Sequence, residues 1–129
     1  MSNVFETDGA VSWTELTTDD VQAAKAFYGE VFNWALEDQD MLGATYTVIK
    51  AGENQIGGIT TKQDGVEGMP SMWKSYITVS NVDETAARVE RSGGKLLLPP
   101  TDIPTVGRII VIQDPQGAVI SAITYEKKE

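Results

Sequence analysis

The chain has 129 residues, of which 41% are hydrophobic and 22% charged, and it carries a net charge of −9 from 10 basic and 19 acidic side chains. This length suffices for one hydrophobic core, and the acidic balance argues against a nucleic-acid partner, because Lys and Arg contacts to phosphate dominate such binding. The chain contains no Cys and no His, which excludes disulfides, thiolate metal sites, a Cys nucleophile and the commonest transition-metal ligand. Only carboxylate and carbonyl oxygens remain for a metal ion, and they suit hard ions such as Mg²⁺ or Ca²⁺.

No stretch of the sequence has the length and apolarity of a membrane span, and its start lacks the charged-then-apolar pattern of a secretory signal. We therefore expect a cytoplasmic protein without a membrane partner. The excess of acidic residues mildly favours a neutral or cationic ligand, although surface carboxylates that keep a protein soluble explain it equally well.

The first half of the sequence predicts a strand, a helix and three further strands. After a loose lead-in over residues 1–9, residues 10–17 alternate in polarity as a strand does. A helix follows over about residues 20–32, with Asp19 as its expected N-cap and Gln22 at the capping-box position. Its apolar residues recur at helical spacing and are expected to lie together on the sheet: Val21, Ala24, Phe27, Tyr28, Val31 and Phe32. Three strands are predicted next, over residues 34–38, 42–51 and 55–61.

The second half repeats this order of elements. Residues 63–70 are polar and rich in Gly and Pro, and they predict a linker. A strand over residues 71–79 leads to a helix with Asn81 as its N-cap and Gly93-Gly94 as its stop. Three strands follow over residues 95–98, 107–112 and 118–125, with a Pro-rich loop at 99–105 and a turn at 114–117. We expect one domain with a first module at about 10–62 and a second at about 71–126.

The two modules can be aligned on each other within the sequence. An offset of 61 residues places Val21 on Val82, and it matches Trp13 with Lys74 and Glu15 with Tyr76. Near the ends of the modules an offset of 64 residues fits better and matches Gly57 with Ser121. The Gly57-Gly58 pair also predicts a bend or a close approach of another backbone.

Three stretches of the sequence resemble the vicinal-oxygen-chelate superfamily, the group of glyoxalases, bleomycin-resistance proteins and extradiol dioxygenases. The resemblance implies an α+β fold in which two βαβββ repeats form a glyoxalase-like open barrel around a cavity. It rests on the order of these stretches: WTELTTDDVQAAKAFYGEVFNW, SYITVSNVDETAARVERSGGKL and VGRIIVIQDPQGAVISAI.

The resemblance also implies where a metal would be bound. Metal-dependent members carry a His on the first strand of each module and a Glu on the last strand. The corresponding positions here are Trp13, Gly57, Lys74 and Ser121. Trp offers no lone pair, Lys repels a cation, Gly has no side chain and Ser is a poor ligand. We therefore expect no metal or other cofactor, and we do not expect a standard glyoxalase or dioxygenase activity, although the sequence leaves open whether the protein is an enzyme.

The same four positions are expected to line a ligand pocket. If Trp13 faces the cavity, alternation along the strand places Glu15 beside it, and the repeat adds Lys74 and Tyr76. The alternative is that Trp13 and Tyr76 are core aromatics and that Glu15 and Lys74 form a partly buried ion pair.

Two further residues are candidates for ligand contacts. Arg108 can bind a carboxylate or phosphate group, and the alternative is a salt bridge to the turn at Asp114 or to a nearby acid. Tyr46 is a candidate wall residue of the pocket, although packing within its strand explains it as well.

These residues predict a metal-free protein that binds a small aromatic or cationic molecule in the barrel cavity, with Trp13 and Tyr76 as stacking surfaces and Glu15 as the charge. The alternative is a lyase or isomerase that uses Glu15 as a base together with a recruited hard divalent ion. A third interpretation is a homodimer joined through exposed sheet edges, since members of the family often dimerise.

Overall fold

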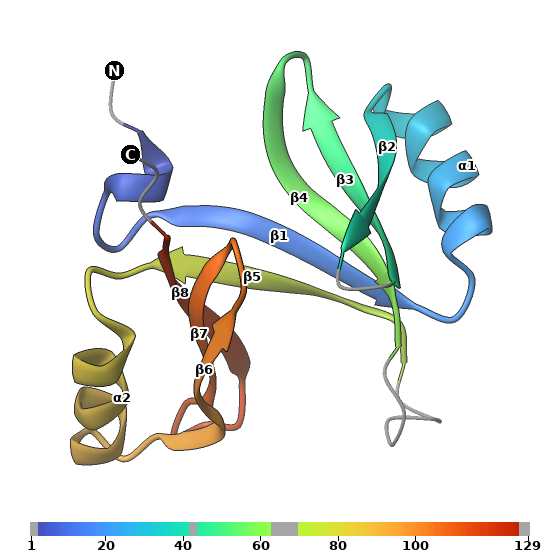
Figure 1. Cartoon of the computed structure of the whole chain (residues 1–129). Coiled ribbons are helices and arrows are strands. Elements are labelled where there is room, and N and C mark those ends of the chain that lie inside the picture. Colours follow the sequence, from blue (N-terminus) through green and yellow to red (C-terminus); the bar gives the residue numbers. More distant parts are fainter. Residues whose placement is uncertain (1–2, 42–43, 63–69, 127–129) are drawn as a thin grey trace. The chain divides into compact units, whose positions relative to one another are not determined.

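A computed structural model describes residues 3–41, 44–62 and 70–126 of the chain (Figure 1). The chain divides into two compact units, which we name the first unit, Trp13–Lys74, and the second unit, Met1–Ser12 with Ser75–Glu129. It passes between the units within two strands, β1 (Val11–Thr18) and β5 (Met72–Thr78). The predicted linker lies outside the described residues, except for Pro70.

The first unit contains most of β1, one helix and three strands in the predicted order. The helix is α1 (Val21–Phe32), and the strands are β2 (Ala35–Met41), β3 (Ala44–Ala51) and β4 (Asn54–Thr61). The order in the sheet is β2-β3-β4-β1, in which β1 and β4 run parallel and the other pairs antiparallel.

The second unit repeats this arrangement with β5. Its other elements are the short 3₁₀ helix η1 (Val4–Glu6), the helix α2 (Val82–Arg91) and the strands β6 (Lys95–Ile103), β7 (Gly107–Gln113) and β8 (Val119–Tyr125). The sheet order is β5-β8-β7-β6, and β5 and β8 run parallel. The predicted α+β fold with two βαβββ repeats is confirmed.

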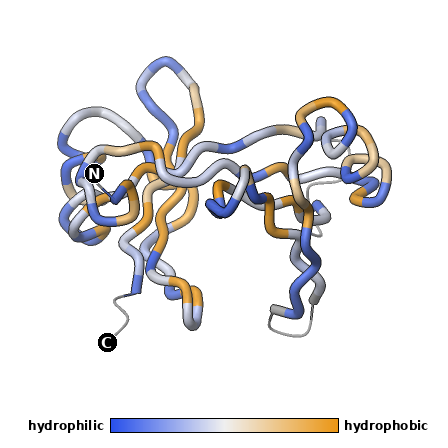
Figure 2. Tube along the Cα trace, turned by 90° about the horizontal axis from the view of Figure 1, so that it is seen from above, coloured by the Kyte–Doolittle hydropathy of each residue, from blue (hydrophilic) through white to orange (hydrophobic). Residues whose placement is uncertain are grey.

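Each unit has its own core between its helix and one face of its sheet, and hydrophobic stretches of the trace recur in both units (Figure 2). In the first unit Leu16, Ile49 and Ile59 are buried against α1. In the second unit the buried cluster consists of Val82, Ala86, Ile110 and Ala122. No helix in the described part of the chain is long and apolar enough to cross a membrane.

The apolar residues of α1 lie on the sheet only in part, which corrects the sequence prediction. Val21, Ala24 and Tyr28 pack against the first core, but Phe27, Val31 and Phe32 are 58%, 51% and 55% exposed. At 100° per residue Phe27 lies to one side of the three packed residues, and Phe32 is the last residue of the helix. No residue of α1 is buried.

The helix caps are confirmed for α2 and shifted by one residue for α1. Asn81 accepts hydrogen bonds from the backbone amides at the start of α2, as expected. At α1 the cap is Asp20, which accepts from the Ala23 amide at 3.0 Å, whereas Asp19 forms an ion pair with Lys62. Strand β1 continues to Thr18, one residue beyond the predicted end, and so the helix begins later.

Two segments that were predicted to be irregular are ordered. Strand β6 runs through Pro99 and Pro100, because it is the last strand in its unit's order and its pairing with β7 shifts register near these residues. In the lead-in, the Val4 carbonyl accepts a hydrogen bond from Thr78 Oγ1, and the Phe5 ring packs edge-on against Tyr125.

Candidate functional site

Strand β1 separates the core of the first unit from a polar and aromatic face. Leu16 is buried in the core beneath α1. Because successive side chains of a strand point to opposite faces, Trp13 and Glu15 lie on the face of the sheet away from α1. Both residues are half-buried. The predicted grouping of Trp13 with Glu15 on one face of β1 therefore agrees with the structure, while their contact with a ligand stays a prediction.

Tyr46 of β3 joins these two side chains into one chain of hydrogen bonds. The Trp13 indole N–H donates to the Tyr46 hydroxyl oxygen at 3.0 Å. The Tyr46 hydroxyl in turn donates to Glu15 Oε2 at 2.8 Å. The three side chains thus form a fixed cluster of an indole, a phenol and a carboxyl group, and we call it the Trp13–Tyr46–Glu15 cluster.

Gly58 makes this cluster sterically feasible. Strand β4 lies between β3 and β1, so the Tyr46 side chain has to cross β4 to reach Glu15. At the crossing point Gly58 pairs with Glu15, and a Cβ atom added to Gly58 would overlap the Tyr46 hydroxyl and ring. Only a residue without a side chain leaves this space to the phenol.

The structure shifts one predicted site position from Gly57 to its neighbour. Gly57 pairs with Thr14 and therefore belongs to the face that carries Leu16, whereas Gly58 lies in the row of Glu15. In the second unit Ser121 pairs with Tyr76, so its structural counterpart is Gly58. A register shift between Ile49 and Lys50 interrupts the pairing of β3 with β4, and a fixed sequence offset does not capture such an irregularity.

The predicted residues of the second half take three different environments. Tyr76 is half-buried and pairs with Ser121. Both lie on the face of the sheet opposite to the core residue Ala122. Ser121 is 1% exposed, and its hydroxyl has no hydrogen-bond partner among the described residues. Lys74 is half-buried on β5. Ligand contacts of these three residues stay predictions.

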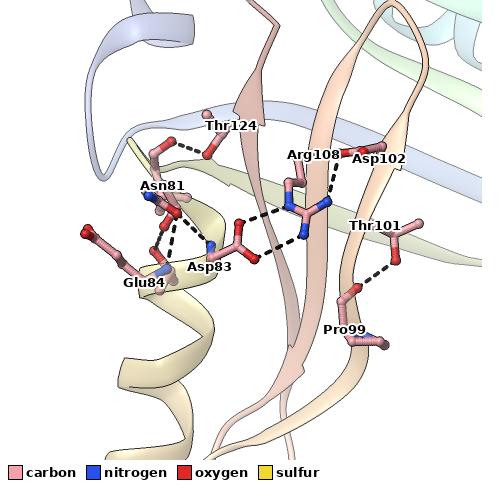
Figure 3. Close-up of polar contacts among 10 residues, drawn as sticks. Asn81, Asp83, Glu84, Pro99, Thr101, Asp102, Arg108 and Thr124 are labelled. Atoms are coloured by element: carbon pink, nitrogen blue, oxygen red, sulfur yellow. Dashed lines mark hydrogen bonds and ion pairs between the residues drawn. The ribbon is translucent and has the colours of Figure 1, made fainter.

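Arg108 lies on the face of its sheet that is covered by α2, opposite to the face of Tyr76 and Ser121, and its side chain is between α2 and β6 (Figure 3). Its Nε and Nη2 atoms bind the two carboxylate oxygens of Asp83 at 3.0 and 3.1 Å, and Nη1 binds Asp102 at 2.9 Å. The hydrogen bonds from Arg108 lower the pKa of Asp83 and, in return, raise that of the guanidinium. The salt-bridge alternative is confirmed, with Asp83 and Asp102 as partners in place of Asp114.

A surface hollow of about 440 Å³ lies beside this ion-pair network. Of the predicted site residues it includes Arg108 alone, whose guanidinium is already bound by two carboxylates. Its lining is as follows: Asp102, Ile103, Pro104, Gly107, Arg108, Thr124 and Glu126.

The positions that correspond to the family's metal ligands do not fit a metal ion. The Trp13 nitrogen carries a hydrogen that it donates to Tyr46, so it has no lone pair to offer. Gly58 has no side chain, and Lys74 carries a positive charge. Among the described residues no group of three or more His, Cys, Asp or Glu side chains is placed to hold a metal ion.

Comparison with known families settles the membership of the chain. Residues 10–121 match the Glyoxalase/Bleomycin resistance protein/Dioxygenase superfamily. The chain belongs to this superfamily.

Two solved structures share the fold of this glyoxalase-superfamily chain at low identity. One is the hypothetical protein BH1468 from Bacillus halodurans C-125, with 11% identity, a TM-score of 0.73, and coverage of 95% of this chain and 99% of that chain. The other is methylmalonyl-CoA epimerase from Mycobacterium tuberculosis, with 14% identity, a TM-score of 0.67, and coverage of 92% and 89%.

Two curated relatives are closer in sequence. The protein named "Putative glyoxylase CFP32" of Mycobacterium tuberculosis is 38% identical over 116 residues, which cover 89% of this chain and 44% of that protein. The "Anthracycline biosynthesis protein DnrV" of Streptomyces peucetius is 29% identical over 126 residues, which cover 88% of this chain and 46% of that protein. The chain therefore spans less than half the length of the curated relatives that it matches.

Sequence reasoning missed Gly58 and the two acidic partners of Arg108. The Gly57-Gly58 pair did give a signal, since it predicted a close approach of another backbone, and the Thr14 backbone indeed lies against Gly57. The signal did not show that the Tyr46 side chain lies against Gly58. The partners of Arg108 are 25 and 6 residues away in the sequence, and no local pattern indicates them.

Proposed function

We propose that this glyoxalase-superfamily chain binds a small aromatic or cationic molecule at the Trp13–Tyr46–Glu15 cluster, without a metal ion. The observation that carries the proposal is the pair of hydrogen bonds that fixes an indole, a phenol and a carboxylate at one place on the sheet. Binding groups that are already held in place lose little conformational entropy when a ligand arrives.

The chemistry of the three groups indicates the class of ligand. Indole and phenol rings attract planar aromatic molecules and cations through their faces. The Glu15 carboxylate adds a preference for positive charge, and the net charge of −9 acts in the same direction at longer range. The name of one curated relative, an anthracycline biosynthesis protein, supports an aromatic ligand.

The proposal is tested by titrating the protein into proflavine, a planar aromatic cation, and following the anisotropy of the dye's own fluorescence. We expect saturable binding that weakens about tenfold in Trp13→Ala, equivalent to about 1.4 kcal/mol and within the range of a partly desolvated cation–π contact. Trp73→Phe is the matched control, because Trp73 contacts Tyr28 and Trp34 beside α1. Equal affinity of Trp13→Ala and wild type would contradict the proposal.

A second candidate is an enzyme of the lyase or isomerase class with Glu15 as the base and a recruited hard divalent ion. It is favoured by the name of the 38% identical relative, and its base would be the Glu15 carboxyl group, which the hydrogen bond from Tyr46 orients. Binding of Mg²⁺ or Mn²⁺ at a hundred times its Kd would stabilise the fold by about 2.7 kcal/mol through mass action. A thermal unfolding series in which neither ion raises the Tm would exclude this mechanism.

A further inference from the structure

The two units differ in the sign of the charge that they expose. In the described part of the first unit every exposed charged residue is acidic. Its four Lys residues are all half-buried, and three of them form ion pairs with acidic side chains at 2.9–3.1 Å. The second unit exposes both signs, with Arg88, Arg91 and Lys95 among its exposed residues. Negative charge therefore dominates the surface of the first unit.

An apolar patch interrupts this acidic surface and extends from α1 to the start of β5. We call it the α1 patch, and its members are between 37% and 58% exposed: Phe27, Val31, Phe32, Met72 and Trp73. With about 150–250 Å² for a whole aromatic side chain, these fractions correspond to an exposed apolar area on the order of 400 Å². The largest apolar patch of a typical monomer is of this size and is often functional.

Aromatic contacts hold the α1 patch in a fixed arrangement. Tyr28 is at its centre, with Phe27, Phe32 and Trp73 at ring-centroid distances of 5.0, 6.0 and 5.2 Å. The Trp73 indole N–H also donates to the Tyr28 hydroxyl at 3.2 Å. Rings that are already fixed lose little side-chain entropy on association, as do the central residues of protein interfaces.

Acidic side chains border the α1 patch. Glu30 is exposed and lies three residues after Phe27, so the two side chains are neighbours on the surface of the helix. Asp20 caps the start of the same helix. Lys25 is the one cation of α1, and both carboxylate oxygens of Asp38 already bind it, at 2.9 and 3.0 Å. A partner that covers the α1 patch therefore meets carboxylates at its border.

We infer that the α1 patch docks a basic amphipathic helix of another protein. Phe27 and Val31 are four residues apart and form a ridge along α1, against which the apolar stripe of a second helix packs. Lys and Arg side chains at the borders of that stripe are complementary to the acidic border, Glu30 included. Covering the patch buries about 800 Å² on the two partners together, the size of a weak and transient contact.

The charge that favours a basic helix disfavours the other occupants of an apolar patch. A second copy of this chain brings the same acidic surface and a net charge of −9, so the two copies repel each other. A membrane surface of anionic lipids repels the chain for the same reason.

Calorimetric titration with a synthetic helix tests the inference. The probe is an amphipathic peptide of about 18 residues, long enough for five helical turns, with Leu on one face and Lys and Ala elsewhere. The matched peptide has Glu in place of every Lys. We expect saturable binding of the Lys peptide at about 50 mM NaCl, at least tenfold weaker binding of the Glu peptide, and a loss of affinity for the Lys peptide as NaCl rises to about 500 mM.

Substitutions in the α1 patch locate the binding. Phe27→Ala/Val31→Ala removes the ridge at two positions that are 58% and 51% exposed, and it should weaken the Lys peptide at least tenfold. The matched control is Leu97→Ala/Val119→Ala, at two positions of the second unit that are 48% and 46% exposed, and it should leave the affinity unchanged. Glu30→Gln should weaken binding at low salt more than at high salt. Circular dichroism confirms that each variant is folded.

Four results would overturn the inference. They are no binding of the Lys peptide, equal binding of the two peptides, equal affinity of the wild type and Phe27→Ala/Val31→Ala, and loss in this variant of self-association or of binding to phosphatidylglycerol vesicles. The last result would assign the patch to a second copy or to a membrane. The variants keep the Trp13–Tyr46–Glu15 cluster, whose side chains lie on the face of the sheet away from α1, so proflavine anisotropy tests the proposed function separately.

Discussion

The substitution Gly58→Ala probes the arrangement of the site through a single methyl group. The added Cβ would overlap the hydroxyl and ring of Tyr46, which crosses β4 at this point. Tyr46 is able to swing away, so we expect no rearrangement of the backbone. The movement nevertheless breaks both hydrogen bonds of the Tyr46 hydroxyl, one from Trp13 and one to Glu15.

The expected loss of stability follows from these two bonds. A neutral hydrogen bond contributes about 1 kcal/mol to the free energy of unfolding, and one to a charged group about 1.5–3 kcal/mol. Replacing Gly by Ala returns about 0.4–1 kcal/mol, because it restricts the unfolded chain. The net cost is therefore about 2 kcal/mol, or a fall in Tm of roughly 5–10 °C for a chain of this length.

Urea unfolding followed by circular dichroism measures this cost, with Gly29→Ala as the matched control. Gly29 is in α1, and a Cβ atom there would meet Leu36 at an ordinary distance of 3.6 Å. Gly29→Ala is therefore expected to stabilise the protein by about 0.5–1 kcal/mol. In a Tyr46→Ala background the cost of Gly58→Ala should disappear. If Gly58→Ala costs the same in both backgrounds, the crossing of β4 by Tyr46 is not the reason for the glycine.

Three further predictions concern the second unit. Arg108 lowers the pKa of Asp83. The stability that this pair contributes is therefore present above the pKa of an unfolded Asp, and it is lost as the pH falls through the pKa of Asp83 in the folded protein. In Asp83→Asn the urea midpoint should fall less between pH 5 and 2 than in the wild type. Burial raises the pKa of Tyr125 against the opposing effect of its hydrogen bond with Ser12, so its contribution to stability is present below the pKa of an unfolded Tyr and is lost as the pH rises through the folded value. Absorbance at alkaline pH should show a late-titrating component that Tyr125→Phe removes. Asn81→Ala should cost about 1 kcal/mol, since two backbone amides lose their acceptor, and an unchanged urea midpoint would contradict its role as a cap.

The order of elements was accessible from the sequence because it rests on local patterns. The alternation of β1 places Trp13 and Glu15 together whatever the rest of the chain does. Asn81 and the turn at Asp114 are equally local, since their side chains bind amides two to four residues ahead. Such features depend on backbone geometry over a few residues, and sequence spacing reports them directly.

What the sequence did not predict depends on distant partners or on the amount of surface that a helix can cover. Gly57 and Gly58 are indistinguishable until the pairing of β4 with β1 fixes which of them lies beside Glu15. The periodicity of α1 predicts one apolar stripe, but it does not show that Phe27 lies beyond the reach of the sheet. Proline has no backbone N–H to donate, which excludes it from a strand that is paired on both sides. Strand β6 pairs with β7 alone in its unit's order, so it can contain Pro99 and Pro100.

The proposed function is tested most directly by calorimetric titration with a matched pair of ligands, a planar aromatic cation and its neutral isostere of the same shape. If the Trp13–Tyr46–Glu15 cluster is the binding site, the wild type binds the cation more tightly than the isostere, because the Glu15 carboxyl group is fixed beside the two rings by its hydrogen bond from Tyr46. Glu15→Gln keeps the shape of the side chain and should bring the two affinities together by weakening the cation alone. An unchanged preference for the cation in Glu15→Gln, or no binding of either ligand to the wild type, would contradict the account.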